Sequence, residues 1–515
     1  MIAARRTGSY ALKFAAAAGL AWLADWLFLF QWIGATLGYF ALALLAAVAL
    51  LRPATRRDKG GRIGLCAALA FALMLLEDPS LLAVVLYWSA LAFAVLASRI
   101  ARFDHALRWG IRLFIHAALI PLGPLADLRR WLRARRRRPG RRVSRLVPVL
   151  ALPVLGSLVF LLLFASANPL IGDALAALDM GLIAGIISIP GTILWLLAFA
   201  LCWAMLRPLA WGRLAPARES GAAMVLPGVT VESVTLSLLA FNALFALQNG
   251  LDLAFLWSGA PLPAGTTLAG YAHRGAYPLI ATALLAGLFV LVTMRPGTPT
   301  AASRAIRRLV TLWTAQNVFL VASSILRTLD YIEAYSLTRL RIAALVWMAL
   351  VALGLVLICL RLWRGKSDAW LINANAAAAL LVLAGCSAVD LGRMAAAWNV
   401  RHARDAGGQG AVLDLCYLNT LGPSALLPIT ELEARTRDPE LRERLAWSRN
   451  AMMDRMTPVL ADWHGWTWRN DRRLTEAQRI VAERKMPRVR VEWRPCTGVA
   501  RSPEPQAPLT AGPAR

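Results

Sequence analysis

Clusters of arginine and lysine recur in almost every second gap between the apolar stretches of this chain, and the other gaps hold almost none. The apolar stretches are of helix length and run from Lys13 to Leu391. A stretch of about 20 apolar residues spans a bilayer as a helix, and short loops rich in Lys and Arg stay on the cytoplasmic side. The pattern therefore predicts an all-α, polytopic transmembrane helix bundle.

The composition supports a membrane protein and argues against several other classes. Of the 515 residues 58% are hydrophobic, and the mean hydropathy is +0.56, which leaves too little polar surface for a soluble protein of this length. The net charge of +27 could indicate a nucleic-acid partner, but the basic residues lie between apolar runs, so we expect no nucleic acid. Without a metal-binding spacing, a P-loop or a GxSxG motif, we expect no metal and no cofactor, and an enzymatic activity is not favoured.

We expect about eleven spans. They cover residues 12–30, 32–51, 63–78, 81–98, 147–166, 182–206, 231–255, 277–294, 309–327, 341–361 and 371–391. With the N-terminus inside, the cytoplasmic segments carry 32 basic residues and the short outer loops carry 4. This bias predicts that the N-terminus is cytoplasmic and that the C-terminal segment lies on the outer side.

The spans and loops divide the chain into five segments. These are four N-terminal transmembrane helices (1–98), a basic cytoplasmic loop (99–146), a seven-helix transmembrane core (147–391), a small helical outer-face domain (392–494) and a disordered tail (495–515). Within the basic loop, residues 107–125 are moderately apolar and predict an interfacial or re-entrant helix. Cys416 and Cys496 would lie in an oxidising space, and the sequence leaves open whether they pair.

The basic loop contains a run of arginines that we expect to anchor the chain at a lipid surface. The run comprises Arg129, Arg130, Arg133, Arg135, Arg136, Arg137 and Arg138. Each basic residue near an anionic membrane surface contributes about 1 kcal/mol, so anionic head groups are the expected partners. A role in binding a nucleic acid or a specific partner is the alternative.

Polar residues inside apolar spans are the candidates for function, because they are costly there. The seventh span carries Glu232, Asn242, Gln248, Asn249 and Asp252. Gln248 and Asp252 lie one helical turn apart, and Asn242 and Asn249 share a face. Such a stripe either lines a wet cavity or forms hydrogen bonds between helices, and both interpretations remain open.

The ninth span carries a second polar face, with Gln316, Ser323 and Arg327 at compatible helical spacing. The outer loop that we expect after it holds Asp330, Tyr331, Glu333, Arg339 and Arg341. A structural network of ion pairs and a site for an anion or lipid are both consistent with this composition. The outer loop 256–277 adds Tyr271 and Arg274, and Asn373 with Asn375 is expected to cap the eleventh span.

Several motifs resemble a bacterial family of multi-pass inner-membrane proteins that is catalogued only as a domain of unknown function. They are Phe164 to Pro169, Tyr271 to Gly275, Ser324 through Arg327 to Tyr331, Leu337 to Arg341, Trp398 to Val400 and Leu413 to Leu418. The resemblance covers roughly residues 150–430, and Ser336 stands where the family's turn has a glycine. It implies an integral protein of the bacterial inner membrane and assigns no chemistry.

These observations lead to three functional hypotheses. The first is an outer-facing vestibule that binds or transports an anionic small molecule or lipid head group, formed by Asp252, Tyr271, Arg274, Arg327, Tyr331 and Arg341. The second is a structural or regulatory scaffold that recruits an envelope protein partner. The third, which is less favoured, is an intramembrane transferase with Asp330 or Glu333 as its base.

Overall fold

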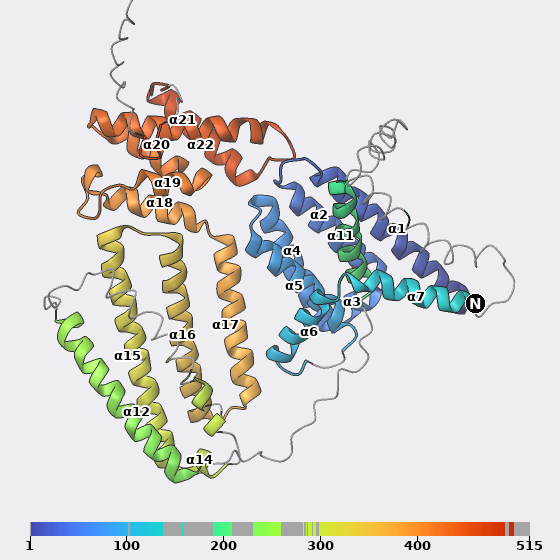
Figure 1. Cartoon of the computed structure of the whole chain (residues 1–515), viewed down its shortest axis with the longest axis horizontal. Coiled ribbons are helices and arrows are strands. Elements are labelled where there is room, and N and C mark those ends of the chain that lie inside the picture. Colours follow the sequence, from blue (N-terminus) through green and yellow to red (C-terminus); the bar gives the residue numbers. More distant parts are fainter. Residues whose placement is uncertain are drawn as a thin grey trace, which may run out of the picture. The chain divides into compact units, whose positions relative to one another are not determined.

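A computed structural model describes residues 2–100, 103–136, 157, 189–208, 230–258, 298–489 and 494–498, with part of 282–294 (Figure 1). For residues 2–9, 131–136, 189 and 255 it describes the backbone alone. The regular secondary structure in these ranges is helical throughout. The chain forms two compact units: residues 1–103 with 108–214, and residues 104–107 with 215–515.

The first unit is a bundle built on close helix contacts. Its helices are α1 (Ile2–Phe28), α2 (Thr36–Leu51), α3 (Pro53–Arg57), α4 (Lys59–Glu77), α5 (Leu81–Ala97), α7 (Leu122–Arg136) and α11 (Ile189–Leu206), while α6 (Ala106–Ala118) begins in the other unit. α1 packs against α2 and α11, and α4 packs against α2 and α5. A Cβ atom built on Gly64 of α4 would lie 2.7 Å from the Cβ of Ala94 in α5. Such small residues let the helix backbones approach closely, as is typical of helices in membranes.

Arg52 joins three helix ends of this first unit. Its guanidinium is buried and donates to the backbone carbonyls of Leu206 at 3.2 Å and Val95 at 3.3 Å. These carbonyls belong to the last turns of α11 and α5, where no intrahelical donor remains. Arg52, which we counted among the basic residues of a cytoplasmic loop, is therefore part of the helix packing.

The second unit contains long apolar helices followed by short polar ones. Its elements are α12 (Val231–Asp252), η1 (Leu253–Trp257), α14 (Pro299–Ala302), α15 (Arg304–Tyr335), α16 (Arg339–Arg364), α17 (Asp368–Ala388), α18 (Leu391–His402), η2 (Arg404–Ala406), α19 (Leu415–Thr420), η3 (Gly422–Ala425), α20 (Leu426–Arg435), α21 (Pro439–Ala461) and α22 (Trp468–Glu483). α15 packs against both α12 and α16, and α17 packs against α16. An apolar core joins the five α-helices from α18 to α22, and Ile332 of α15 and Ile342 of α16 belong to the same core.

The C-terminal helices are attached to the turn between α15 and α16. Buried Asn399 of α18 accepts a hydrogen bond from the Leu337 N–H at 2.7 Å and donates to the Leu337 carbonyl at 2.9 Å. The Tyr417 hydroxyl accepts from the Arg339 N–H at 2.8 Å. This turn and the C-terminal helices therefore lie at one end of the helix pair. The opposite end carries the start of α15 and the close of α16, with their basic residues.

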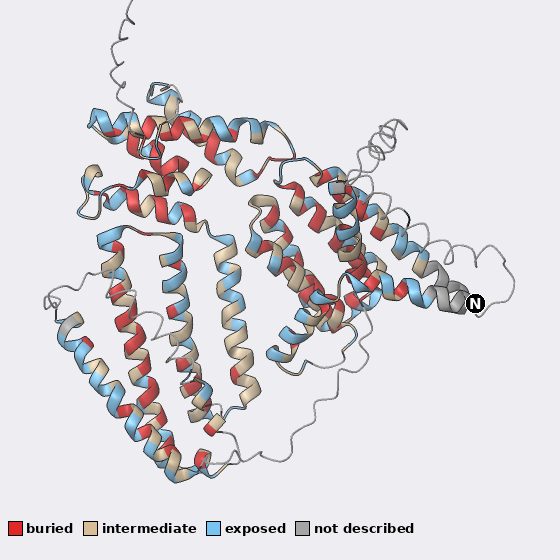
Figure 2. Cartoon of the chain, viewed as in Figure 1, coloured by how far each residue is buried: buried red, intermediate tan, exposed pale blue. Residues whose placement is uncertain are grey.

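Six described helices are long and apolar enough to cross a membrane. They are Tyr10–Phe28, Lys59–Glu77, Val231–Asp252, Arg304–Tyr335, Arg339–Arg364 and Asp368–Ala388. Much of the surface of these helices is exposed or half-buried (Figure 2). Among their apolar residues, Leu381 of α17 is 74% exposed and Leu236 of α12 is 70% exposed. Exposed apolar faces of this extent mark a surface that contacts lipid or another protein, which indicates a membrane-embedded protein.

Other expected spans correspond to shorter or incompletely described segments. Thr36–Leu51, Leu81–Ala97 and Pro190–Leu206 are apolar helices shorter than the six above. Ala106–Ala118 and Leu122–Arg130 meet at a bend of 73°, the geometry of a broken span or a re-entrant loop. The expected span 277–294 is described only in part, and 147–166 lies outside the described residues apart from residue 157.

Two local expectations were wrong. Residues beyond Arg327 do not leave the helix, because α15 continues to Tyr335. Asn373 and Asn375 do not cap α17, which begins at Asp368 with the Ser367 hydroxyl accepting from the Trp370 N–H at 3.2 Å. Instead Asn375 donates to the Leu371 carbonyl at 2.9 Å within the helix.

Candidate functional site

Polar side chains of α12 and α15 meet along the contact between these two helices. Gln316 Nε2 donates to Asn242 Oδ1 at 2.7 Å, and Asn242 Nδ2 donates to the Leu309 carbonyl at 3.2 Å. About two turns further along α12, Asn249 Nδ2 donates to the Gln316 carbonyl at 3.2 Å. Of the two interpretations of the stripe on α12, hydrogen bonding between helices is therefore the one that the structure bears out. We call this contact the α12–α15 seam.

A buried ion pair lies at the end of the seam, where α12 ends. The Arg327 guanidinium of α15 donates to Asp252 Oδ1 at the last residue of α12. The Asp252 side chain is 1% exposed and that of Arg327 is 8% exposed, so both charges have lost most of their water. Gln248 Nε2, one turn earlier on α12, donates to the same carboxylate oxygen at 3.0 Å. The two charges compensate each other, and each would be costly alone at this depth.

The seam has more buried acceptors than donors to fill them. Asp252 Oδ2, Asn249 Oδ1 and Gln316 Oε1 are buried and have no hydrogen-bond partner among the described residues. A buried acceptor left without a partner costs about 1–3 kcal/mol. Such oxygens are positions where water or a donor group of a ligand gains a hydrogen bond.

The chain changes its helical geometry directly after Asp252. Residues Leu253–Trp257 form a π-helical turn, η1, a feature that is frequent at functional sites. The wider turn carries Trp257, whose Nε1 donates to Ser323 Oγ of α15 at 3.0 Å, while its ring stacks on Phe319 at 5.6 Å between centroids. Sequence periodicity does not reveal a π-turn, so this element was missed.

The turn between α15 and α16 brings together a second pair of predicted residues. The Arg341 guanidinium lies 4.2 Å from the centre of the Tyr331 ring, a cation–π contact, and donates to the Tyr335 carbonyl at 2.6 Å. The Tyr335 ring also contacts Tyr331, with 4.9 Å between centroids. Tyr331 lies one helical turn beyond Arg327 on the same face of α15, so this pair borders the ion pair.

The structure describes only some of the remaining residues that we predicted for the ligand site and the lipid anchor. Tyr271 and Arg274 lie outside the described residues. Arg129 and Arg130 lie exposed on α7, where Arg130 forms an ion pair with Asp127 at 3.4 Å. The side chains of Arg133, Arg135 and Arg136 and all of Arg137 and Arg138 lie outside the described part of the chain.

The C-terminal helices are cross-linked in two ways that the sequence did not establish. Cys416 and Cys496 form a disulfide bond with their Cα atoms 4.7 Å apart. Glu433 and Arg449 form a buried bidentate ion pair, with N–O distances of 2.7 and 3.0 Å. Burial raises the pKa of Glu433, against the opposing effect of Arg449. In sequence both residues look like members of a solvated charged helix.

The described residues offer no grouping of three His, Cys, Asp or Glu side chains that could hold a metal ion. The seam instead combines one guanidinium, one carboxylate and several amides. These groups recognise anions and polar head groups through hydrogen bonds, and a buried guanidinium binds carboxylate or phosphate in two places.

The sequence pattern of one protein family matches residues 63–432, which include the whole seam and the α15–α16 turn. No curated protein matches the chain. No solved structure matches it either.

Proposed function

Since the chain belongs to the family described as a domain of unknown function (DUF4153), we propose its activity from the seam itself: the protein binds an anionic group, the carboxylate or phosphate of a small molecule or lipid head group, at Arg327. The observation that carries this proposal is the buried Arg327–Asp252 pair between apolar helices. An ionisable residue within a membrane-spanning segment is costly and is a candidate functional residue by default.

In the proposed mechanism Asp252 occupies the position at Arg327 that the ligand takes when it binds. When the site is empty, the Asp252 carboxylate neutralises Arg327. An incoming anion arrives with a proton and exchanges with Asp252 at the guanidinium: the anion pairs with Arg327, and the proton neutralises the released carboxyl, so that no buried charge is left alone. Gln248 continues to donate to the released carboxyl. The unfilled acceptors of the seam, Asn249 Oδ1 and Gln316 Oε1, receive donors from the ligand or from water that enters with it.

The proposed site opens to the outer face of the bacterial inner membrane, with about eleven spans, a cytoplasmic N-terminus and an outer C-terminus. Two observations support this orientation. The expected cytoplasmic segments carry 32 basic residues against 4 in the short outer loops. The α15–α16 turn lies at the same end as the helices joined by the Cys416–Cys496 disulfide, and disulfides persist in oxidising compartments outside the cytoplasm. Tyr271 and Arg274 are proposed members of the site on their sequence position alone.

The test is a thermal-shift screen of the purified protein in neutral detergent against phosphates, carboxylates and anionic lipids. A ligand at about 100 times its Kd stabilises the folded protein by about 2.7 kcal/mol. The comparison variant is Asp252→Asn/Arg327→Gln, which removes both charges and leaves no single charge buried. Arg327→Ala alone adds the cost of an uncompensated Asp252, so it serves as a second variant.

We expect at least one anion to stabilise the wild type and to lose this effect in the double variant. Arg62→Gln, an exposed position on α4, is the control that should keep the response. A phosphate or carboxylate that stabilises wild type and double variant equally would remove Arg327 from the site. A well-folded wild type with no response to any anion would end the binding proposal.

A scaffold function is the second candidate, and one observation favours it. The C-terminal helices carry an open groove of about 460 Å³ whose walls include Arg401, Arg435, Arg437 and Asp438. The arginines of this groove suit an acidic surface of an envelope protein partner, because complementary charges give such contacts their specificity. The test is recovery of a co-purifying protein that is lost in Arg435→Glu/Arg437→Glu and kept in Arg327→Gln; equal recovery from both variants would count against this surface.

A further inference from the structure

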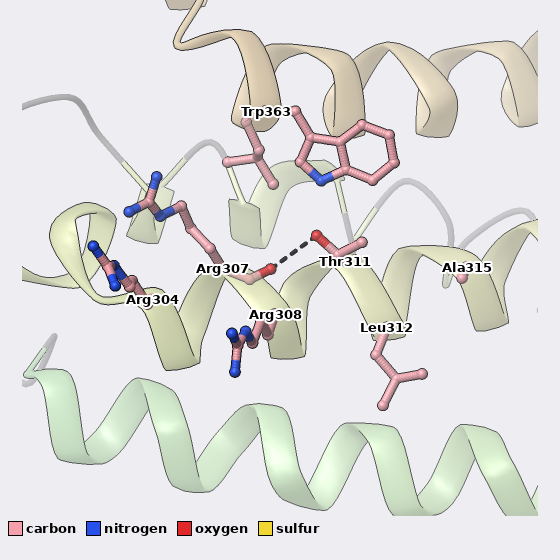
Figure 3. Close-up of a pocket in the computed structure, with 8 residues that line it drawn as sticks. Arg304, Arg307, Arg308, Thr311, Leu312, Ala315 and Trp363 are labelled. Atoms are coloured by element: carbon pink, nitrogen blue, oxygen red, sulfur yellow. Dashed lines mark hydrogen bonds between the residues drawn. The ribbon is translucent and has the colours of Figure 1, made fainter.

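A second basic feature lies at the end of α15 that is remote from Arg327. The 23 residues from Arg304 to Arg327 span about 35 Å of helix. At this end an open groove of about 730 Å³ runs between the first turns of α15 and the last turns of α16 (Figure 3). Its walls include Arg304, Arg307, Arg308, Leu312, Leu362 and Trp363.

The groove is strongly and uniformly positive. Arg304, Arg307 and Arg308 are all exposed, and among the described residues none of them forms an ion pair. None of the described residues that line the groove is acidic. The N-terminus of α15 adds the positive end of its helix dipole. An anion is therefore the complementary ligand.

The other walls of the groove are apolar and exposed. Leu312 is 53% exposed and Trp363 is 69% exposed. Along α15 the arginines are followed by Thr311, Leu312 and Ala315, so the surface changes from basic to apolar within three turns (Figure 3). Tryptophan is enriched at the level of lipid head groups, where one side of the ring is apolar and the other is wet.

We propose that this groove binds an anionic phospholipid, with its phosphate on Arg304, Arg307 and Arg308 and an acyl chain along Leu312. The position of the groove at the end of two membrane-spanning helices places it at the level of the head groups. A free phosphate would satisfy the arginines and leave Leu312 and Trp363 uncovered, so the lipid accounts for both halves of the surface. This site lies at the opposite end of α15 from Arg327 and shares no residue with the basic run on α7.

The experiment titrates the purified full-length protein in neutral detergent with phosphatidylglycerol and follows the melting temperature. Phosphatidylcholine and inorganic phosphate are the comparison probes. The test variant is Arg304→Gln/Arg307→Gln/Arg308→Gln. The matched control is Arg56→Gln/Arg57→Gln/Arg62→Gln, which removes three exposed basic residues outside any groove described here.

Phosphatidylglycerol should stabilise the wild type saturably, and phosphatidylcholine and phosphate should do so far more weakly. Each basic residue near an anionic surface contributes roughly a factor of five in affinity, so the test variant should weaken binding about 100-fold, while the control stays within about two-fold. Unchanged binding in the test variant would overturn the proposal, and so would phosphate that binds as tightly as the lipid. If the triple variant fails to fold, Arg307→Gln should weaken binding about five-fold, and no change there would equally overturn it.

Discussion

Ser336 is held in a backbone conformation that suits glycine. Its φ of 69° and ψ of 164° lie in a region that is almost exclusive to glycine, and residues held there cost about 1–3 kcal/mol. The family that the sequence motifs resemble has glycine at this position of the turn before Leu337. The structure supplies the physical reason, because the chain must reverse between α15 and α16 within three residues.

Ser336→Gly should therefore stabilise the protein. The relief of strain exceeds the extra unfolded-chain entropy of glycine, and we expect a net gain of about 1 kcal/mol in the free energy of unfolding. Thermal unfolding in detergent measures it. Gly365→Ala is the matched control: Gly365 has a φ of 60°, so this change should destabilise. A Ser336→Gly variant no more stable than wild type would contradict the strain argument.

Asp390, between α17 and α18, gives a prediction for pH. Burial alone would raise the pKa of its carboxyl, but the Arg393 N–H, the Arg473 guanidinium and the Ser424 hydroxyl outweigh burial and lower the pKa. A carboxyl with a lowered folded pKa adds stability that is present above its unfolded pKa of about 3.9 and is lost as the pH falls through the folded value. Stability should thus decline below about pH 4, and less so in Asp390→Asn. Denaturant unfolding at several pH values measures this; identical pH profiles would contradict it.

For the secondary-structure elements, the length of the apolar stretches predicted most helices. Polar residues near the helix ends led to wrong boundaries. The expected ninth span stopped at Arg327 because the next residues include Asp330 and Glu333. α15 continues to Tyr335 and ends where Ser336 takes its positive φ, and within the helix Arg327 pairs with Asp252, 75 residues earlier in the chain. Helical spacing correctly placed Gln316, Ser323 and Arg327 on one face. Their partners on α12 depend on which helices pack together, and one sequence does not contain that information.

The disulfide joins elements that the local sequence does not connect. Cys416 lies in the first turn of α19, and Cys496 lies 80 residues later. The Cys496 carbonyl accepts from Asn419 Nδ2 at 2.9 Å. Closing a loop of this length contributes about 2–4 kcal/mol in typical cases. Cys416→Ser/Cys496→Ser should lower the free energy of unfolding by that amount, while Cys66→Ser should not change it appreciably. A double variant as stable as the wild type would contradict the Cys416–Cys496 disulfide. A reducing agent that lowers the stability of the double variant would contradict it too.

For the whole molecule, the orientation in the membrane is the main prediction. If the N-terminus is cytoplasmic, a reporter enzyme that is active only outside the cytoplasm should be inactive when fused after Lys366 and active when fused after Arg488. A fluorescent reporter that folds only inside should give the reverse pattern. The charge pattern of the sequence suffices for this prediction, because the rule depends on counts in short loops. Activity of the outer reporter at Lys366 would reverse the proposed topology and place the seam opening on the cytoplasmic side.

The exchange of partners at Arg327 is the central claim, and the affinity of single variants tests it most directly. Asp252→Asn removes the internal competitor and leaves Arg327 in place, whereas Arg327→Gln removes the binding group itself. Both variants are titrated with the anion found in the screen. Asp252→Asn should bind it with a lower Kd than the wild type, and Arg327→Gln should not bind it. Equal affinities in wild type and both variants would show that the buried pair is a structural contact and not a binding site.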